Sequence, residues 1–128
     1  MTEALKFRLR HTMLPVADLD RSVDFYTRLL GMTVVRERRD SPTPTAYVGY
    51  GDEASYPALE LISGTEHAGA KWHGHINIAV SDLPALCARL QAAGVTFARP
   101  HREANGRIRF AYALDPDGFE VELVEGAQ

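Results

Sequence analysis

The stretch that decides the fold is HTMLPVADL at residues 11–19, because its pattern returns as HINIAVSDL at residues 75–83. Each copy has a histidine, a valine five positions later, and an aspartate–leucine pair after one further residue, at an offset of 75 − 11 = 64. A helix-like stretch follows each copy and ends on a glycine, Gly31 or Gly94. The sequence therefore predicts a duplicated unit of about sixty residues, with one copy in each half of the chain.

The strands of each half can be assigned from the spacing of apolar residues. Side chains alternate along 11–16 and 75–80 with the period of two of half-buried strands, and both runs begin with a histidine on the more polar face. Further strand-like runs follow each helix: 33–35 and 58–62 in the first half, and 95–97 and 119–124 in the second. The DPDG sequence at 115–118 predicts a tight hairpin turn before the last run.

The helices are bounded by capping residues. We expect Asp20 to cap the first helix, which runs to Leu30 and stops at Gly31. The second helix has Asp82 near its cap and Pro84 in its first turn.

One strand, one helix and three further strands in each half predict an α+β fold of two tandem βαβββ modules, at about residues 7–63 and 71–126. A chain of 128 residues has the length of a single domain. The helices are expected to pack on one face of antiparallel sheets, which leaves the other faces free to form a cleft.

Composition and charge exclude several classes of protein. Fourteen Lys and Arg against seventeen Asp and Glu give a net charge of −3, which disfavours nucleic acid as a partner. No signal peptide and no long apolar run are found, so we expect a cytoplasmic protein without a membrane partner. The single cysteine, Cys87, cannot form a disulfide within the chain and is expected to be a buried, inert thiol.

Four side chains are candidates for chemistry, because the period of two places them on the cleft faces of their strands. They are two histidines and two glutamates at matching places in the halves: His11, Glu60, His75 and Glu122. A carboxylate within an apolar strand needs a partner, since burying an unpaired charge is costly. Imidazole nitrogen and carboxylate oxygen form a ligand set suited to a divalent first-row metal ion. A duplication could equally preserve four structural residues, so the pattern alone leaves a metal site and a structural role open.

The motifs that surround these residues resemble the glyoxalase I (lactoylglutathione lyase) family of the vicinal oxygen chelate superfamily. The resemblance lies in HTML at 11–14, DLDRSVDFY at 18–26, LGM at 30–32, YVGYG at 47–51, LEL at 59–61, GHI at 74–76, DPDGF at 115–119 and VEL at 121–123. It covers nearly the whole chain. The opening helix motif is shared across the superfamily, whereas the four ligand positions are more selective for the isomerases.

The resemblance implies a metal-dependent isomerase and a homodimer. The family's ligands correspond to His11, Glu60, His75 and Glu122, with nickel or cobalt as the expected ion and zinc as a possible one. The substrate would be a small-molecule thiol adduct, the hemithioacetal of a 2-oxoaldehyde, and the catalytic base would be Glu122 or Glu60.

The chain departs from the family where the thiol is recognised. Pro15, Gly64 and Ala104 stand where the resemblance predicts arginine, asparagine and lysine contacts to glutathione. Three basic residues are expected to supply replacement contacts to the substrate: Lys71, Arg102 and Arg107. Two alternative functions stay open, namely another enzyme of the superfamily, such as an epimerase or dioxygenase, and a metal-free protein that binds a drug.

Overall fold

The computed structural model describes residues 4–68 and 74–126. The chain divides into two compact units, Met1–Glu66 and His67–Gln128. Of the residues singled out in the sequence, Lys71 lies outside the described ranges. No helix in those ranges is long and apolar enough to cross a membrane.

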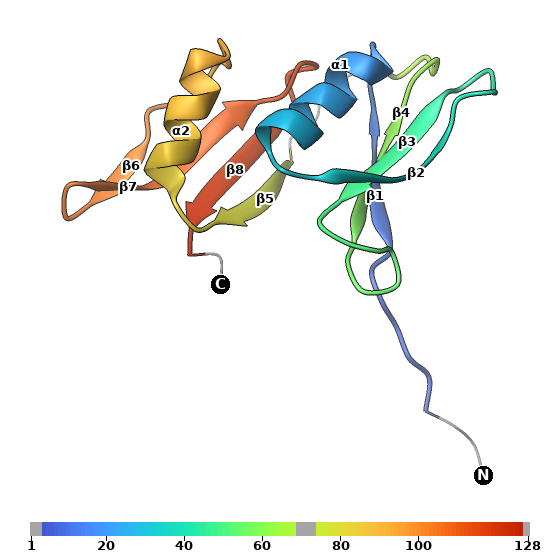
Figure 1. Cartoon of the computed structure of the whole chain (residues 1–128), viewed down its shortest axis with the longest axis horizontal. Helices are drawn as coiled ribbons and strands as arrows, with labels where there is room; N and C mark the ends of the chain where they lie inside the picture. Colours follow the sequence, from blue (N-terminus) through green and yellow to red (C-terminus); the bar gives the residue numbers. More distant parts are fainter. Residues whose placement is uncertain (1–3, 69–73, 127–128) are drawn as a thin grey trace. The chain divides into compact units, whose positions relative to one another are not determined.

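The first unit is a four-stranded sheet with one continuous helical segment, which can be followed in Figure 1. Its elements are β1 (His11–Pro15), α1 (Leu19–Asp24), a π-helical turn (Phe25–Leu29), β2 (Thr33–Arg38), β3 (Thr45–Gly49) and β4 (Ala58–Ile62). The strand order is β1-β4-β3-β2. The pairs β2–β3 and β3–β4 are antiparallel, but β1 is parallel to β4, so the sheet is mixed rather than antiparallel as predicted.

The second unit repeats this topology. Its elements are β5 (His75–Val80), α2 (Leu83–Ala92), β6 (Arg102–Ala104), β7 (Arg107–Leu114) and β8 (Glu120–Glu125). The strand order is β5-β8-β7-β6, with β5 again parallel to its neighbour β8. The α+β fold and its duplication are therefore confirmed, and the parallel first strand is a common property of both halves.

Two local predictions are wrong. The cap of α1 is Asp18 rather than Asp20, because the Asp18 carboxylate accepts a hydrogen bond of 3.1 Å from the Arg21 amide while its own backbone is extended. The run 95–97 forms no regular strand but a single bridge between Phe97 and Ala113. After this bridge, the next segment to pair with β7 is β6. The strand expected after the second helix is therefore interrupted.

Other boundaries follow the sequence. The Asp82 carboxylate caps α2 by accepting from the Ala85 amide at 3.2 Å, and a proline lies in the first turn. Gly31 and Gly94 follow the two helical segments with φ of +77° and +78°, a left-handed conformation that glycine adopts without strain.

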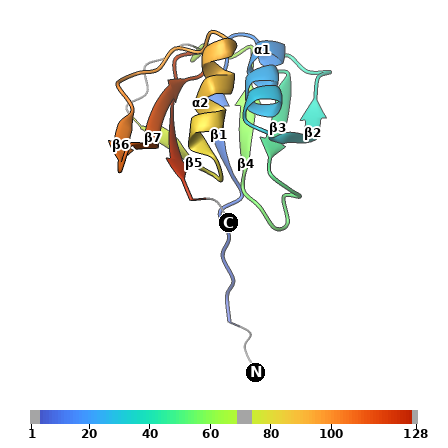
Figure 2. The ribbon, with the colours of Figure 1, turned by 60° about the vertical axis from the view of Figure 1, so that its left-hand side comes forward.

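The core of each unit lies between its helix and one face of its sheet (Figure 2). In the first unit Leu14 pairs with Leu61 across β1 and β4, and both side chains are fully buried. Val121 and Leu123 occupy the same place on β8. Because side chains alternate along a strand, Glu60, next to Leu61, and Glu122, between Val121 and Leu123, point to the other face of the sheet.

Candidate functional site

The first unit brings His11 and Glu60 together, and we call them the first pair. Met13 is the residue that pairs directly with Glu60 across β1 and β4, so His11 lies two positions earlier on the same face. His11 Nε2 is 4.0 Å from Glu60 Oε1, and the side chains are 31% and 18% exposed. The glutamate is thus largely shielded, while the imidazole reaches toward solvent.

The second unit contains the same arrangement in His75 and Glu122, the second pair. Here Asn77 pairs with Glu122 across β5 and β8, which gives the histidine the same two-residue stagger. His75 Nε2 lies 2.8 Å from Glu122 Oε2, and the side chains are 49% and 18% exposed. The repeat seen in the sequence is therefore a repeat of register, which brings one imidazole and one carboxylate within 4.0 Å of each other in each unit.

A tyrosine that the sequence analysis did not single out accompanies the first pair. Tyr47 is the β3 residue paired with Glu60, and its hydroxyl donates a hydrogen bond to Glu60 Oε2. This hydrogen bond, together with burial, raises the pKa of Tyr47. The ring also meets His11 edge-on, with centroids 5.4 Å apart. Tyr47 therefore contacts both members of the pair.

In each unit an arginine guanidinium covers the ring of one tyrosine. The Arg36 guanidinium lies 3.6 Å from the centroid of Tyr47, and the Arg99 guanidinium lies 4.2 Å from the centroid of Tyr112. Tyr112 is paired with Glu122 on β7 and β8, as Tyr47 is with Glu60. A signal existed in the sequence, because these residues recur at 99 − 36 = 63 and 112 − 47 = 65, close to the offset of the repeat.

The donor set fits a divalent metal ion in its chemistry. Each pair offers an imidazole nitrogen and a carboxylate, which suit nickel, cobalt and zinc alike. His11 Nδ1 is buried without a hydrogen-bond partner in the described residues. Within those ranges, no group of three or more His, Cys, Asp or Glu side chains is arranged to hold a metal ion. What each unit supplies by itself is one pair of donors.

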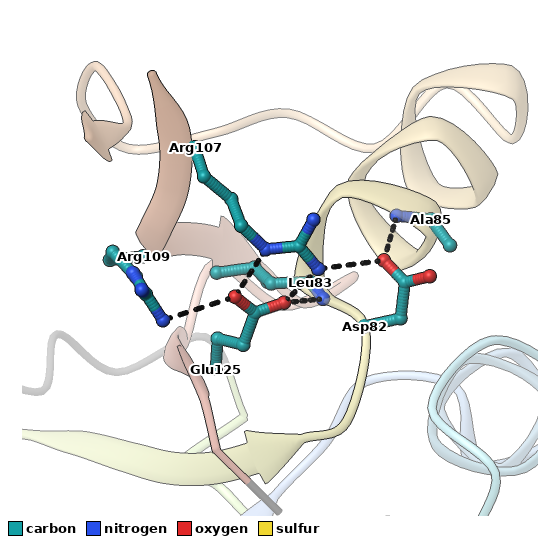
Figure 3. A network of polar contacts seen from close by, with 6 residues as sticks. All are labelled: Asp82, Leu83, Ala85, Arg107, Arg109 and Glu125. Carbon is teal, nitrogen blue, oxygen red and sulfur yellow. Dashed lines mark hydrogen bonds and ion pairs between the residues drawn. The ribbon is translucent and has the colours of Figure 1, made fainter. Parts of the chain in front are cut away.

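The predicted substrate-binding arginines make contacts within the second unit. Arg107 donates to both carboxylate oxygens of Glu125, at 2.5 and 2.6 Å, and lies 3.5 Å from Asp82, as Figure 3 shows. Arg109 approaches the same carboxylate at 3.3 Å. The Arg102 guanidinium lies 4.8 Å from the ring centroid of Phe110. A role of Arg102 and Arg107 in binding substrate stays a prediction.

Glu125 connects three elements of this unit. Besides the arginines of β7, its carboxylate accepts a hydrogen bond of 3.1 Å from the amide of Leu83, at the start of α2. The hydrogen bonds from Arg107, then the amide of Leu83 and the charges of both arginines, lower the pKa of Glu125 to about 2. The carboxylate is therefore ionised at neutral pH.

This pKa predicts how stability depends on pH. Because the folded-state pKa lies below the value of about 4.3 in an unfolded chain, the stabilisation is complete above that value and is lost as the pH falls toward 2. We expect Glu125→Gln to lower the urea midpoint at neutral pH, by an amount that shrinks steadily below about pH 5. Unfolding curves at several pH values, with Glu103→Gln on exposed β6 as the control, measure this. If Glu125→Gln lowers the urea midpoint by the same amount at every pH, the low pKa of Glu125 is wrong.

The positions that depart from the family have structural consequences. A Cβ on Gly64 would lie 2.6 Å from the Pro42 carbonyl oxygen, and its φ is +78°, so an asparagine there requires the backbone to shift. Pro15 ends β1 opposite Ile62 and has no amide hydrogen to donate. Ala104 lies exposed at the end of β6. The departure at Gly64 therefore cannot be reversed by a side-chain substitution alone.

Comparisons with known proteins agree with this fold. Residues 8–123 match the family model of the Glyoxalase/Bleomycin resistance protein/Dioxygenase superfamily, and the chain belongs to this superfamily. A probable lactoylglutathione lyase of Vibrio cholerae is 37% identical over 127 residues, which are 94% of this chain and 92% of that protein. The lactoylglutathione lyase of Escherichia coli O157:H7 is 36% identical over 92% of each chain.

Solved structures of similar fold narrow the assignment from the superfamily to one type of enzyme. The trypanothione-dependent glyoxalase I of Leishmania major superposes with a TM-score of 0.81 at 36% identity, covering 94% of this chain and 87% of that one. Glyoxalase I of Zea mays gives 0.81 at 31% identity, with 45% of its longer chain covered. Within the superfamily, the protein is thus an enzyme of the lyase class, of the glyoxalase I type.

Proposed function

We propose that the protein is a metal-dependent isomerase of the glyoxalase I type. Its substrate would be the hemithioacetal formed from methylglyoxal and a thiol, with glutathione as the first candidate, and its product the 2-hydroxyacyl thioester. One observation carries the proposal, namely the repeated His–Glu pair at the same register of both sheets. The names of the relatives support it.

The four side chains of the two pairs are the proposed ligands of one divalent ion, nickel or cobalt in preference to zinc. When bound, the ion would supply Lewis-acid polarisation of the two oxygens of the adduct. In this role the ligands are His11, Glu60, His75 and Glu122. The imidazoles would serve as neutral donors and the carboxylates as charged ones, which balances the charge of the ion.

The reaction needs one proton to move between neighbouring carbons. The carboxylate of Glu122 or Glu60 would take the proton from the carbon that bears sulfur and return it to the adjacent carbonyl carbon. The hydroxyl proton of the first carbon passes to the oxygen of the second, so no oxidant or reductant is required. The side chain of each glutamate is 18% exposed, which would let its carboxylate meet substrate while limiting the access of water.

The thiol would be held by basic residues other than those of the family. Lys71 and Arg102 are the proposed contacts, and Arg107 would join them only by sharing its guanidinium with Glu125. The Leishmania major relative is described as trypanothione-dependent, so the test below includes trypanothione as a second thiol. A homodimer, a single domain comprising both units and a cytoplasmic location complete the proposal.

Removal of the metal tests the proposal directly. Protein stripped with a chelator should be inactive with methylglyoxal and either thiol, and nickel or cobalt should restore thioester formation, followed by absorbance. We expect removal of the ion to lower the rate by about a thousandfold, because a bound metal ion contributes several kcal/mol to stabilisation of the transition state. No restored turnover with any of nickel, cobalt and zinc would move the assignment to a different chelated substrate or to metal-free ligand binding.

A further inference from the structure

Tyr47 is the point at which the contacts of the first pair converge. Its hydroxyl donates to Glu60 Oε2, and its ring meets the His11 imidazole in a T-shaped arrangement. The tyrosine itself is 7% exposed, so it holds a fixed place in the sheet rather than a mobile one at the surface. The carboxylate is thereby restrained from one side by a hydroxyl donor and faces the imidazole with its other oxygen.

The ring of Tyr47 is in turn fixed from β2. Arg36 is the residue paired with Tyr47 across β2 and β3, and its guanidinium covers the ring at 3.6 Å. Arg36 Nε donates to Glu53 Oε2 at 2.7 Å, and this hydrogen bond raises the pKa of the arginine. A continuous series of contacts therefore runs from Glu53 through Arg36 and Tyr47 to Glu60.

The second unit provides an internal comparison. Tyr112 has the same register and a covering arginine, but no hydrogen bond joins its hydroxyl to Glu122 in the described part of the chain. Glu122 instead lies 2.8 Å from His75 Nε2, against 4.0 Å in the first pair. The two pairs thus differ in what holds the glutamate: a tyrosine hydroxyl donates to the carboxylate in the first pair, whereas the histidine lies within hydrogen-bonding distance of it in the second.

We propose that Tyr47 is a positioning residue that presets the first pair for a divalent ion. Its hydroxyl fixes the orientation of the Glu60 carboxylate, and its ring, in T-shaped contact with the His11 imidazole, fixes the plane of that imidazole. Groups that orient metal ligands from behind reduce the freedom that a ligand loses on binding, and they tune its donor strength. The inference rests on the proposed function, in which both residues are metal ligands.

The variant Tyr47→Phe tests this most sharply, because it removes the hydroxyl and keeps the ring that meets His11 and Arg36. We expect its affinity for nickel and cobalt to fall by about 10- to 100-fold, the usual loss when a group behind a ligand is removed. Calorimetric titration of metal-free protein gives this affinity without any assay of activity. The matched control Tyr112→Phe deletes the equivalent hydroxyl, which donates to none of the described glutamates, and should keep the affinity of the original protein.

A second readout separates positioning from general damage to the fold. The visible absorption of the cobalt-loaded protein reports the arrangement of its ligands, and it should change in Tyr47→Phe and stay the same in Tyr112→Phe. Urea unfolding of both metal-free variants checks that the sheet is intact. Equal metal affinity and equal cobalt spectra for Tyr47→Phe and the original protein would overturn the inference alone. An original protein that binds no divalent ion would overturn the proposed function together with it.

Discussion

The variant Glu122→Gln should lose turnover by about a thousandfold or more while the protein keeps its fold. A general base contributes about 10²- to 10⁴-fold to a rate, and this carboxylate is also a proposed ligand of the ion. Glutamine has the same shape, and the half-exposed His75 is the ion-pair partner of Glu122 in the described residues, so little stability depends on its charge. The measurement is kcat/KM at saturating metal, accompanied by a urea unfolding curve.

Two comparisons make this result specific. Glu103→Gln removes a carboxylate from exposed β6 and should retain the activity of the original protein. Glu60→Gln changes the matching glutamate of the first pair, and comparison of the two losses shows which carboxylate acts as the base. If Glu122→Gln keeps more than about a tenth of the activity, the hypothesis that Glu122 transfers the proton is wrong.

The largest loss of stability is expected from Leu61→Ala. Leu61 is fully buried on β4, where it pairs with Leu14 on one side and Ala46 on the other. Truncation of such a leucine leaves a cavity and costs about 2–5 kcal/mol of the free energy of unfolding. Since a domain has a total of about 5–15 kcal/mol, the variant would be close to unfolding at room temperature.

Urea unfolding followed by circular dichroism measures this change. Leu9→Ala is the matched control, because the same side chain is 71% exposed there and its loss should change stability by less than about 0.5 kcal/mol. A cost below about 1 kcal/mol for Leu61→Ala would mean that the layer between α1 and its sheet collapses around the gap.

The side of the sheet on which Glu60 and Glu122 lie could be predicted, because the period of two in a strand assigns a face to every residue. Which histidine meets which glutamate could not, because it depends on the pairing of β1 with β4 and of β5 with β8. The repeat then required both halves to fold alike. The parallel pairing of each first strand was not predicted, since alternation along one strand does not reveal the direction of its neighbour. Register between strands is likewise set by turns and by packing in three dimensions.

The contacts of Tyr47 depend on that register. Nothing in the run TAYVG at 45–49 shows that its tyrosine will meet Glu60, because the two are brought together only when β3 and β4 pair at this alignment. The helix cap was misplaced for a related reason: Asp18 and Asp20 are both good capping residues, and the extended backbone at Asp18 decides between them. Local sequence offers such candidates, and tertiary structure selects among them.

The π-helical turn at Phe25–Leu29 accounts for a difference of one residue between the helical segments of the two halves. From the capping aspartate to the terminal glycine, the first half spans 31 − 18 = 13 positions and the second 94 − 82 = 12. A π-helical turn accommodates one residue more than an α-helical turn. The additional residue of the first copy therefore lies within its helical segment, where the π-helical turn accommodates it. Duplicated proteins can accept such an additional residue without any loop to receive it.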